Sequence, residues 1–263
     1  MSATIPAKPT LLLVAGALLS GCTTTESFDA RSFSAVELHA VQVALDNGDL
    51  SVIGSDSDVA TVEARVYGYA GKEEVATRNH DGVSWAADMQ RGVLTVNSHS
   101  EYERAGVDLD LSVPRDAELL VEAEGDVELA GLHGPVIVTA SDIDLHDSVG
   151  NMQLSADSTI HVEGVRGDLF LVAEGSVSAE LQPEPGDHIQ ILSGGSGVQV
   201  ELPYGVPVDL EVWGDPDYEV VVEDLGFDRV ATAPGFFSGV AGSGAVRVEI
   251  EAVGGPVTIR GGW

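Results

Sequence analysis

The sequence predicts an all-β protein, built mainly as one parallel β-solenoid in which short strands stack coil upon coil. Three observations lead to this prediction. Short segments with alternating apolar residues follow one another along the 263-residue chain. Aliphatic residues recur at intervals of 16 or 17 positions. The chain also holds 31 glycines and only 5% aromatic residues, which suits tight corners and small stacked side chains.

The N-terminal residues 1–21 resemble a bacterial lipoprotein signal peptide. Their apolar stretch, residues 11–19, is too short to span a bilayer, which needs about 20 residues, but it fits the apolar region of a signal peptide. Leu19-Ser20-Gly21-Cys22 resembles a lipobox, which implies cleavage before Cys22 and lipidation of that cysteine. An ordinary signal peptide followed by a chance cysteine is the alternative. Thr23 stands where an inner-membrane retention signal would have Asp, which favours the outer membrane in a Gram-negative cell.

Strand signals dominate after this leader. Residues 22–35 are expected to form a short tether, and residues 36–263 the solenoid domain. The expected early strands share apolar–polar alternation, and they are VELHAVQVAL, LSVIG, VATVEARVYG, GVLTVNS and VDLDLSVP. Asn47-Gly48 and Asp81-Gly82 supply turns between them. No amphipathic helix is expected.

The repeat places aliphatic residues in three inward columns. The first column is Val127, Ile143, Ile160, Val177 and Val198. The second, two residues further along, is Leu129, Leu145, Val162, Ala179 and Val200. The third, on another strand, is Val121, Val138, Leu154, Leu171 and Ile191. Because all three columns lengthen at the same place, residues 182–188 are expected to form a loop that leaves the coil stack intact.

The regular coils are expected over residues 119–203, with an irregular cap over residues 204–263. Solenoids need atypical end units to cover the exposed core. The cap segment has longer turns and more aromatic residues, and it ends in an expected strand pair, Val246–Ile250 and Val257–Ile259.

Several phrases are similar to the bacterial β-strand-repeat family known as "putative adhesins". The similar phrases are DNGDLSVIGSD, VDLDLSVPRDAELLVEAEGDVELAGLHGP, VRGDLFLVAEGSVSAEL and SGAVRVEIEAVGGPVTIRGG. The resemblance covers residues 36–263. It implies a parallel β-solenoid at the cell surface or envelope, and it implies no catalytic residues.

The charge balance narrows the possible partners. The chain has 43 acidic and 12 basic residues, for a net charge of −31. Phosphates would repel such a surface, so a nucleic-acid partner is not expected. An acidic, lysine-poor surface is typical either of a saline habitat, where salt screens self-repulsion, or of an exported acidic protein.

An outward ladder of polar residues is a candidate for metal binding or catalysis. It runs through Glu128, Asp144, His161, Ser178 and Gln199. Glu128 and Asp144 are the weak candidates for a cation or for polysaccharide cleavage, but a solvated acidic face is preferred. The histidines are not expected to gather. No cofactor, metal or enzymatic activity is therefore predicted.

Two groups of apolar residues are candidates for a binding surface. Phe236 and Phe237 lie in the expected cap, where they either fill its core or contact a ligand. The second group lies on outward positions of the other strand, which read Leu120, Ile137, Gln153, Phe170 and Gln190. Its apolar members are expected to be covered by the N-terminal strands; the alternative is an interaction patch.

The predicted function is that of a lipid-anchored envelope protein with a non-catalytic, adhesin-like or scaffolding surface. Its expected partners are the membrane, through the lipid anchor, and an envelope protein or a glycan. One alternative is a β-helix that binds or processes carbohydrate, and another is an accessory module of an envelope sensor.

Overall fold

The structure is a computed structural model that describes residues 11–13 and 22–262. The expected signal peptide lies outside the described residues except for Leu11–Leu13. The chain divides into two compact units, Met1–Glu128 and Leu129–Trp263, and each is described by itself. Both are made of β-strands, which confirms the predicted all-β class. In the part of the chain that is described, no helix has the length and apolar character of a membrane-spanning segment.

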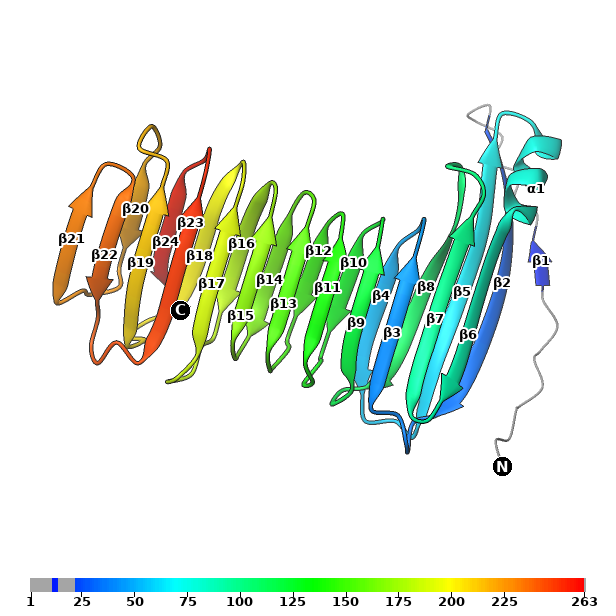
Figure 1. The fold of residues 1–263 in the computed structure, drawn as a ribbon, viewed down its shortest axis with the longest axis horizontal. Coiled ribbons are helices and arrows are strands. Elements are labelled where there is room, and N and C mark those ends of the chain that lie inside the picture. The colour runs from blue at the N-terminus through cyan, green and yellow to red at the C-terminus, as the bar shows by residue number, and fades with distance from the viewer. Residues whose placement is uncertain (1–10, 14–21, 263) are drawn as a thin grey trace. The chain divides into compact units, whose positions relative to one another are not determined.

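The first unit contains two groups of hydrogen-bonded strands (Figure 1). One follows the order β1-β2-β5-β8-β4 and the other the order β9-β3-β7-β6. Both groups are mixed, because β4 pairs with β8 in parallel whereas β2, β5 and β8 pair antiparallel, and because β3 pairs with β7 in parallel whereas β6 and β7 pair antiparallel. The strands are β1 (Leu11–Leu13), β2 (Thr23–Ser34), β3 (Ala40–Leu45), β4 (Leu50–Ser55), β5 (Val59–Ala70), β6 (Val83–Gln90), β7 (Val93–Ser100), β8 (Ala105–Pro114) and β9 (Glu118–Ala123).

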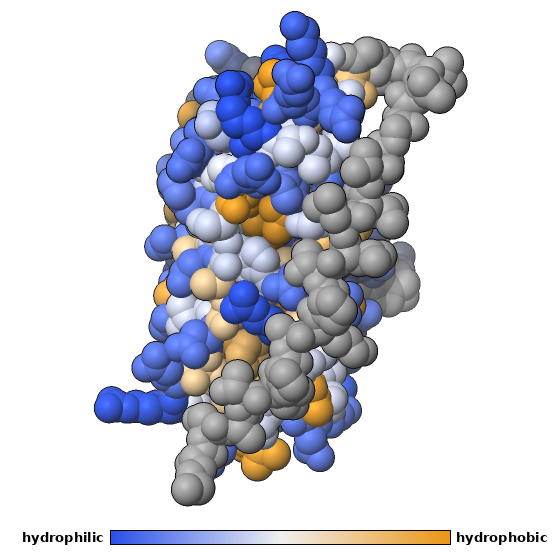
Figure 2. Space-filling view, turned by 90° about the vertical axis from the view of Figure 1, so that its right-hand side faces the viewer, coloured by the Kyte–Doolittle hydropathy of each residue, from blue (hydrophilic) through white to orange (hydrophobic). Residues whose placement is uncertain are grey.

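The five early strands predicted from alternation are confirmed, as β3, β4, β5, β7 and β8. The segment expected to be a tether instead forms the 12-residue strand β2, which pairs with β5 along its whole length. On the side where Figure 1 draws β2 and α1, hydrophilic side chains make up most of the visible surface, and apolar side chains appear only in small separate groups (Figure 2).

The helix α1 (Glu73–Asp81) was not expected from the sequence. Only Ala76 and Asn79 of this helix are buried, so its sequence lacks the periodic apolar pattern that would predict a helix. Its signals are electrostatic: two acidic residues in the first turn and two basic ones in the last complement the helix dipole. The helix is fixed to the sheet by polar contacts, including the Asn79 amide, which donates to the Tyr69 carbonyl at 3.1 Å.

In the second unit the chain alternates between two ladders of strands (Figure 1). One ladder has the order β12-β14-β16-β18-β24-β20 and the other β11-β13-β15-β17-β23-β19-β22-β21. Neighbouring strands of both ladders pair in parallel, except that β22 pairs antiparallel with β19 and β21. The first six strands are β11 (Val136–Ala140), β12 (Ile143–His146), β13 (Met152–Ala156), β14 (Ile160–Val165), β15 (Leu169–Ala173) and β16 (Ser176–Leu181). The remaining strands are β17 (His188–Ser193), β18 (Gly197–Pro203), β19 (Val208–Gly214), β20 (Val220–Glu223), β21 (Arg229–Ala233), β22 (Phe236–Val240), β23 (Val246–Ala252) and β24 (Val257–Gly262). A further strand, β10 (Val127–Ala130), contains the boundary between the units.

The predicted column registers are confirmed within this unit. Ile143, Ile160, Val177 and Val198 pair in succession across neighbouring strands, and so do Val138, Leu154, Leu171 and Ile191. These side chains are 0–3% exposed. Residues 182–187 form the predicted loop between β16 and β17, and the register continues across it. Burial of this periodic set between the ladders supplies the hydrophobic core.

The closing strand pair forms as β23 and β24 but does not stand at the end of the ladders. β23 lies between β17 and β19, and β24 lies between β18 and β20. The last two strands of the chain thus return into the stack, and β19 to β22 pack beyond them. Sequence order alone could not show this insertion.

Candidate functional site

The site is built on the outward face of the β11–β13–β15–β17–β23 ladder. Side chains in register across these strands form what we call the Phe170 row, which consists of Ile137, Gln153, Phe170, Gln190 and Glu249. Each alternates with buried neighbours, since successive residues of a strand point to opposite faces. The row is therefore a direct product of the same alternation that fills the core.

The apolar members of this row remain in contact with solvent. Ile137 is 39% exposed and Phe170 is 38% exposed, and Leu120 in the first unit is 38% exposed. The expectation that N-terminal strands cover these positions is therefore wrong. The alternation gave their direction correctly, but it does not show whether another element covers the outward face.

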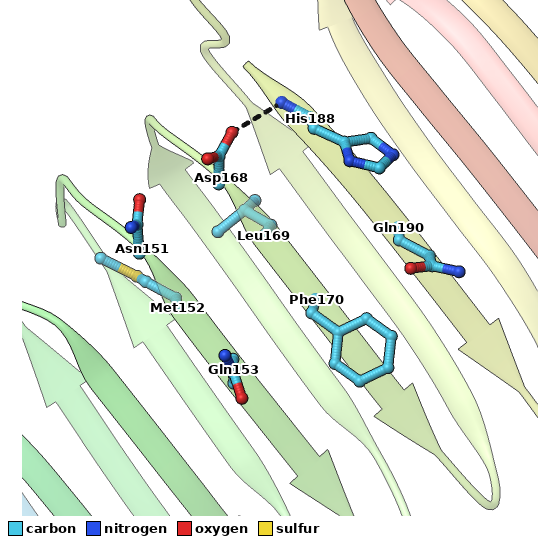
Figure 3. A pocket seen from close by; sticks show the side chains of 8 residues that line it. All are labelled: Asn151, Met152, Gln153, Asp168, Leu169, Phe170, His188 and Gln190. Carbon is cyan, nitrogen blue, oxygen red and sulfur yellow. Dashed lines mark hydrogen bonds between the residues drawn. The ribbon is translucent and has the colours of Figure 1, made fainter.

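A shallow hollow of about 240 Å³ lies around Phe170 (Figure 3). Residues at the starts and middles of three adjacent strands line it, namely Asn151, Met152, Gln153, Asp168, Leu169, Phe170, His188 and Gln190. The side chains of Met152 and Leu169 point into the core, so these two residues border the hollow from its inner side. The outward groups are an aromatic ring, amides, an imidazole and a carboxylate. These groups can stack against a ligand and exchange hydrogen bonds with it.

The charged groups beside the hollow hold one another in place. The His188 backbone N–H donates to Asp168 Oδ1 at 2.8 Å, and the His188 ring Nε2 lies 3.2 Å from Glu249 Oε2. The Arg247 guanidinium also donates to Glu249, with Nε 2.8 Å from Oε1. These hydrogen bonds, chiefly that from Arg247 and then that from His188, lower the pKa of Glu249. Glu249 therefore stays ionised at neutral pH, and its negative charge is paired with the positive charge of Arg247.

The structure separates the two phenylalanines that the sequence grouped. Phe237 is 9% exposed and packs edge-on against Phe227, with ring centroids 5.2 Å apart. Phe236 points to the opposite face, where its ring lies 6.3 Å from that of Trp213, a side chain that is 43% exposed. Adjacent residues of one strand cannot share a face, so only Phe236 belongs to a surface. Trp213 was not singled out from the sequence, because its partner is 23 positions away and their pairing is antiparallel.

The acidic ladder of Glu128, Asp144 and His161 is divided between the two units. Asp144 pairs in register with His161, and Glu128 ends the first unit, so the two carboxylates lie in different units. No group of three or more His, Cys, Asp or Glu side chains among the described residues is arranged to hold a metal ion. Sequence reasoning was wrong about two histidines, since the rings of His146 and His161 meet edge to face at 5.8 Å. The two histidines are diagonal neighbours on the adjacent strands β12 and β14. They stand at different positions within their coils, so the repeat did not predict that they meet.

One constellation has the residue types of a nucleophilic triad and was missed from the sequence. Ser27 Oγ lies 2.9 Å from His80 Nε2, and His80 Nδ1 lies 3.3 Å from Asp81 Oδ1. However, Ser27 is buried where α1 packs on β2, so a substrate carbonyl has no access to its hydroxyl. The contact satisfies a buried hydroxyl and fixes the helix to the sheet.

Cys22 is a free, exposed cysteine immediately before β2. The other lipobox positions, residues 19–21, lie outside the described residues. The lipidation of Cys22 remains a prediction from the sequence.

Comparison with known proteins gives distant structural neighbours only. No protein-family model matches the chain, and no curated protein matches it. A putative cell adhesion protein from Clostridium sporogenes is 9% identical, with a TM-score of 0.37, and the match covers 90% of this chain and 100% of that one. A putative adhesin from Bacteroides fragilis is 10% identical, with a TM-score of 0.30, and covers 88% and 96%. A putative lipid binding protein from Parabacteroides distasonis is 9% identical, with a TM-score of 0.28, and covers 90% and 97%.

Proposed function

We propose that this chain is a lipid-anchored protein of the bacterial cell envelope that serves as a non-catalytic, adhesin-like binding or scaffolding surface. In this proposal the alternating ladders of the second unit are successive coils of a parallel β-solenoid, consistent with their confirmed registers. The anchor is the acylated Cys22, and the outer membrane is its location in a Gram-negative cell.

The observation that carries the binding role is the open Phe170 row. A fold that buries its inward column positions at 0–3% exposure leaves the outward side chains of Ile137 and Phe170 at 39% and 38%. Exposed apolar side chains next to polar groups with hydrogen-bonding capacity mark interaction surfaces. A ladder of hydrogen-bonded strands presents them with little entropy left to lose on binding.

The binding role is tested by photo-crosslinking in intact cells from a photoreactive amino acid at Phe170. We expect a discrete crosslinked product that is not formed from the same group at Ile53, which is 55% exposed in the first unit. No product from Phe170, or equal products from both positions, would contradict a specific binding surface there.

The anchor is tested separately with Cys22→Ser. Loss of the thiol removes the acylation site, so the variant is expected to leave the membrane fraction, whereas Ser20→Ala keeps a small residue in the lipobox and should remain. Immunoblotting of fractionated cells measures both. Unchanged fractionation of Cys22→Ser would rule out the lipid anchor.

A further inference from the structure

The outward face of the second unit carries a second row beside the Phe170 row. Residues in register across β15, β17, β23, β19 and β22 form the Trp213 row, which consists of Val172, Leu192, Glu251, Trp213 and Phe236. Val172 lies two residues beyond Phe170 on β15, so both rows share one face. One face therefore carries Phe170 and the Trp213–Phe236 pair, with Glu251 between Leu192 and Trp213 in the row.

From these two rows we propose that this face binds a neutral polysaccharide with a linear backbone, with Phe170 and Trp213 as its stacking platforms. The inference rests on the binding function proposed above and names its ligand class. The carbon-bound hydrogens of a pyranose ring form an apolar surface that can be buried against an aromatic ring. The hydroxyls around the ring are both donors and acceptors of hydrogen bonds.

Two amides are placed to meet those hydroxyls. Gln153 and Gln190 pair in register with Phe170 from either side, each about 4.8 Å away across the sheet. An amide side chain offers two donor hydrogens and a carbonyl acceptor, so it can satisfy hydroxyls of either orientation. Both amides border the hollow around Phe170, as Figure 3 shows.

The separation of the aromatic residues favours a polymer over a single sugar. Trp213 lies three strands from Val172 in its row, a span of about 14 Å. One sugar ring cannot reach both platforms, whereas a chain of several units laid across the strands contacts both. The face is open and lacks walls, which suits a long ligand.

The charges of the face select a neutral glycan. Carboxylates of Glu211, Glu249 and Glu251 lie within or next to the two rows, and the positive charge of Arg247 is engaged by Glu249. An anionic polysaccharide or an anionic lipid surface would be repelled. A second copy of the same face would bring like charges together.

The test is affinity electrophoresis of the full chain, purified in detergent, through native gels that contain galactomannan, xyloglucan or mixed-linkage β-glucan. We expect at least one of these neutral polymers to retard the protein, and the anionic polymer alginate to leave it unretarded. Phe170→Ala and Trp213→Ala should each weaken binding by about tenfold. Phe170→Tyr, which keeps the ring, should retain it.

Two controls separate stacking from structural damage. Tyr204→Ala removes an aromatic side chain that is 66% exposed in the turn after β18, away from both rows, and should leave retardation unchanged. Phe170→Leu keeps an apolar side chain and the fold but should lose binding as Phe170→Ala does.

Three results would overturn the inference: no retardation by any neutral polymer, equal binding by Phe170→Ala and the unmodified chain, or equal retardation by alginate. If the neutral polymers fail while crosslinking from Phe170 captures a protein, the glycan assignment falls and the binding function stands.

Discussion

Val177 illustrates how strictly a column position is specified at the scale of one residue. Its side chain is 1% exposed and lies between Ile160 and Val198 on the neighbouring strands. Val177→Asp would bury a carboxylate without a partner, so it should lower the free energy of unfolding by about 3 kcal/mol or more. Urea unfolding followed by circular dichroism measures the change.

The adjacent position provides the matched control for that substitution. Ser178 points outward, between His161 and Gln199, so Ser178→Asp should change stability by no more than about 0.5 kcal/mol. Equal effects of the two substitutions would show that the inward and outward assignments of β16 are wrong.

Asp142 links two successive turns of the second unit. Its Oδ1 accepts hydrogen bonds from the Thr159 backbone N–H at 2.9 Å and from the Thr159 hydroxyl. The hydroxyl is the main reason that the pKa of Asp142 is lowered from its ordinary value of 3.8. A lowered pKa means that the carboxylate stabilises the fold above its unfolded-state pKa, and that this contribution disappears as pH falls through the folded value.

Asp142→Asn should therefore reduce stability at pH 7 by less than about 1 kcal/mol, because solvent screens an exposed carboxylate. At pH 2 the difference from the unmodified chain should largely vanish. Urea midpoints at the two pH values test this, and a gap that widens on acidification would contradict the assigned role of the carboxylate.

At the scale of elements, a corner between strands depends on contact with the next corner. Gly167 has a φ of +106°, and a Cβ added there would lie 2.3 Å from the Gly150 carbonyl oxygen. Gly186, in the loop before β17, has a similar φ of +109° but no atom within 4 Å of an added Cβ. The pair separates backbone strain from steric conflict between stacked corners.

Gly186→Ala should cost about 1 kcal/mol from backbone strain alone, and Gly167→Ala should cost at least about 1 kcal/mol more because the corner must also move. Thermal and urea unfolding of both variants measure the difference. Similar losses would mean that the corners at Gly150 and Gly167 do not stack closely.

Elements with a periodic apolar pattern were predictable, and those held by polar contacts were not. The columns through Ile160 and Leu154 follow from alternation and a repeat of 16 or 17 residues. The helix α1 was not predicted because Asn79 and His80 attach it through single hydrogen bonds, to the Tyr69 carbonyl and to Ser27 in β2. Strand β2 was not predicted because its own sequence is polar. It is held in place by antiparallel pairing with β5.

The same division applies to the candidate site. Phe170 and its neighbours in the row were placed correctly on one outward face, because a period of two fixes direction. Whether another element covers that face depends on the entire fold, and local sequence does not encode it. The Trp213–Phe236 pair could not be predicted without knowing that β22 pairs antiparallel with β19.

At the scale of the whole molecule, the net charge of −31 predicts a stability that rises with salt. Charges on the surface interact over about 10 Å at 0.1 M salt but only about 3 Å at 1 M. The thermal midpoint at pH 7 should therefore increase by several degrees between 0.1 and 1 M sodium chloride. Near pH 4.1, the isoelectric point, the same increment should be much smaller. A midpoint that falls with salt at pH 7 would show that attractive ion pairs outweigh self-repulsion.

The return of β23 and β24 into the ladders determines the order in which the strands of the second unit can pair during folding. During synthesis, β19 to β22 emerge before the strands against which they must pack. Until β23 reaches β17 and β24 reaches β18, both growing edges are bare and can pair with other chains. Such long-range pairing is intrinsically slow, so the period before the final insertion is when the nascent protein most needs a chaperone.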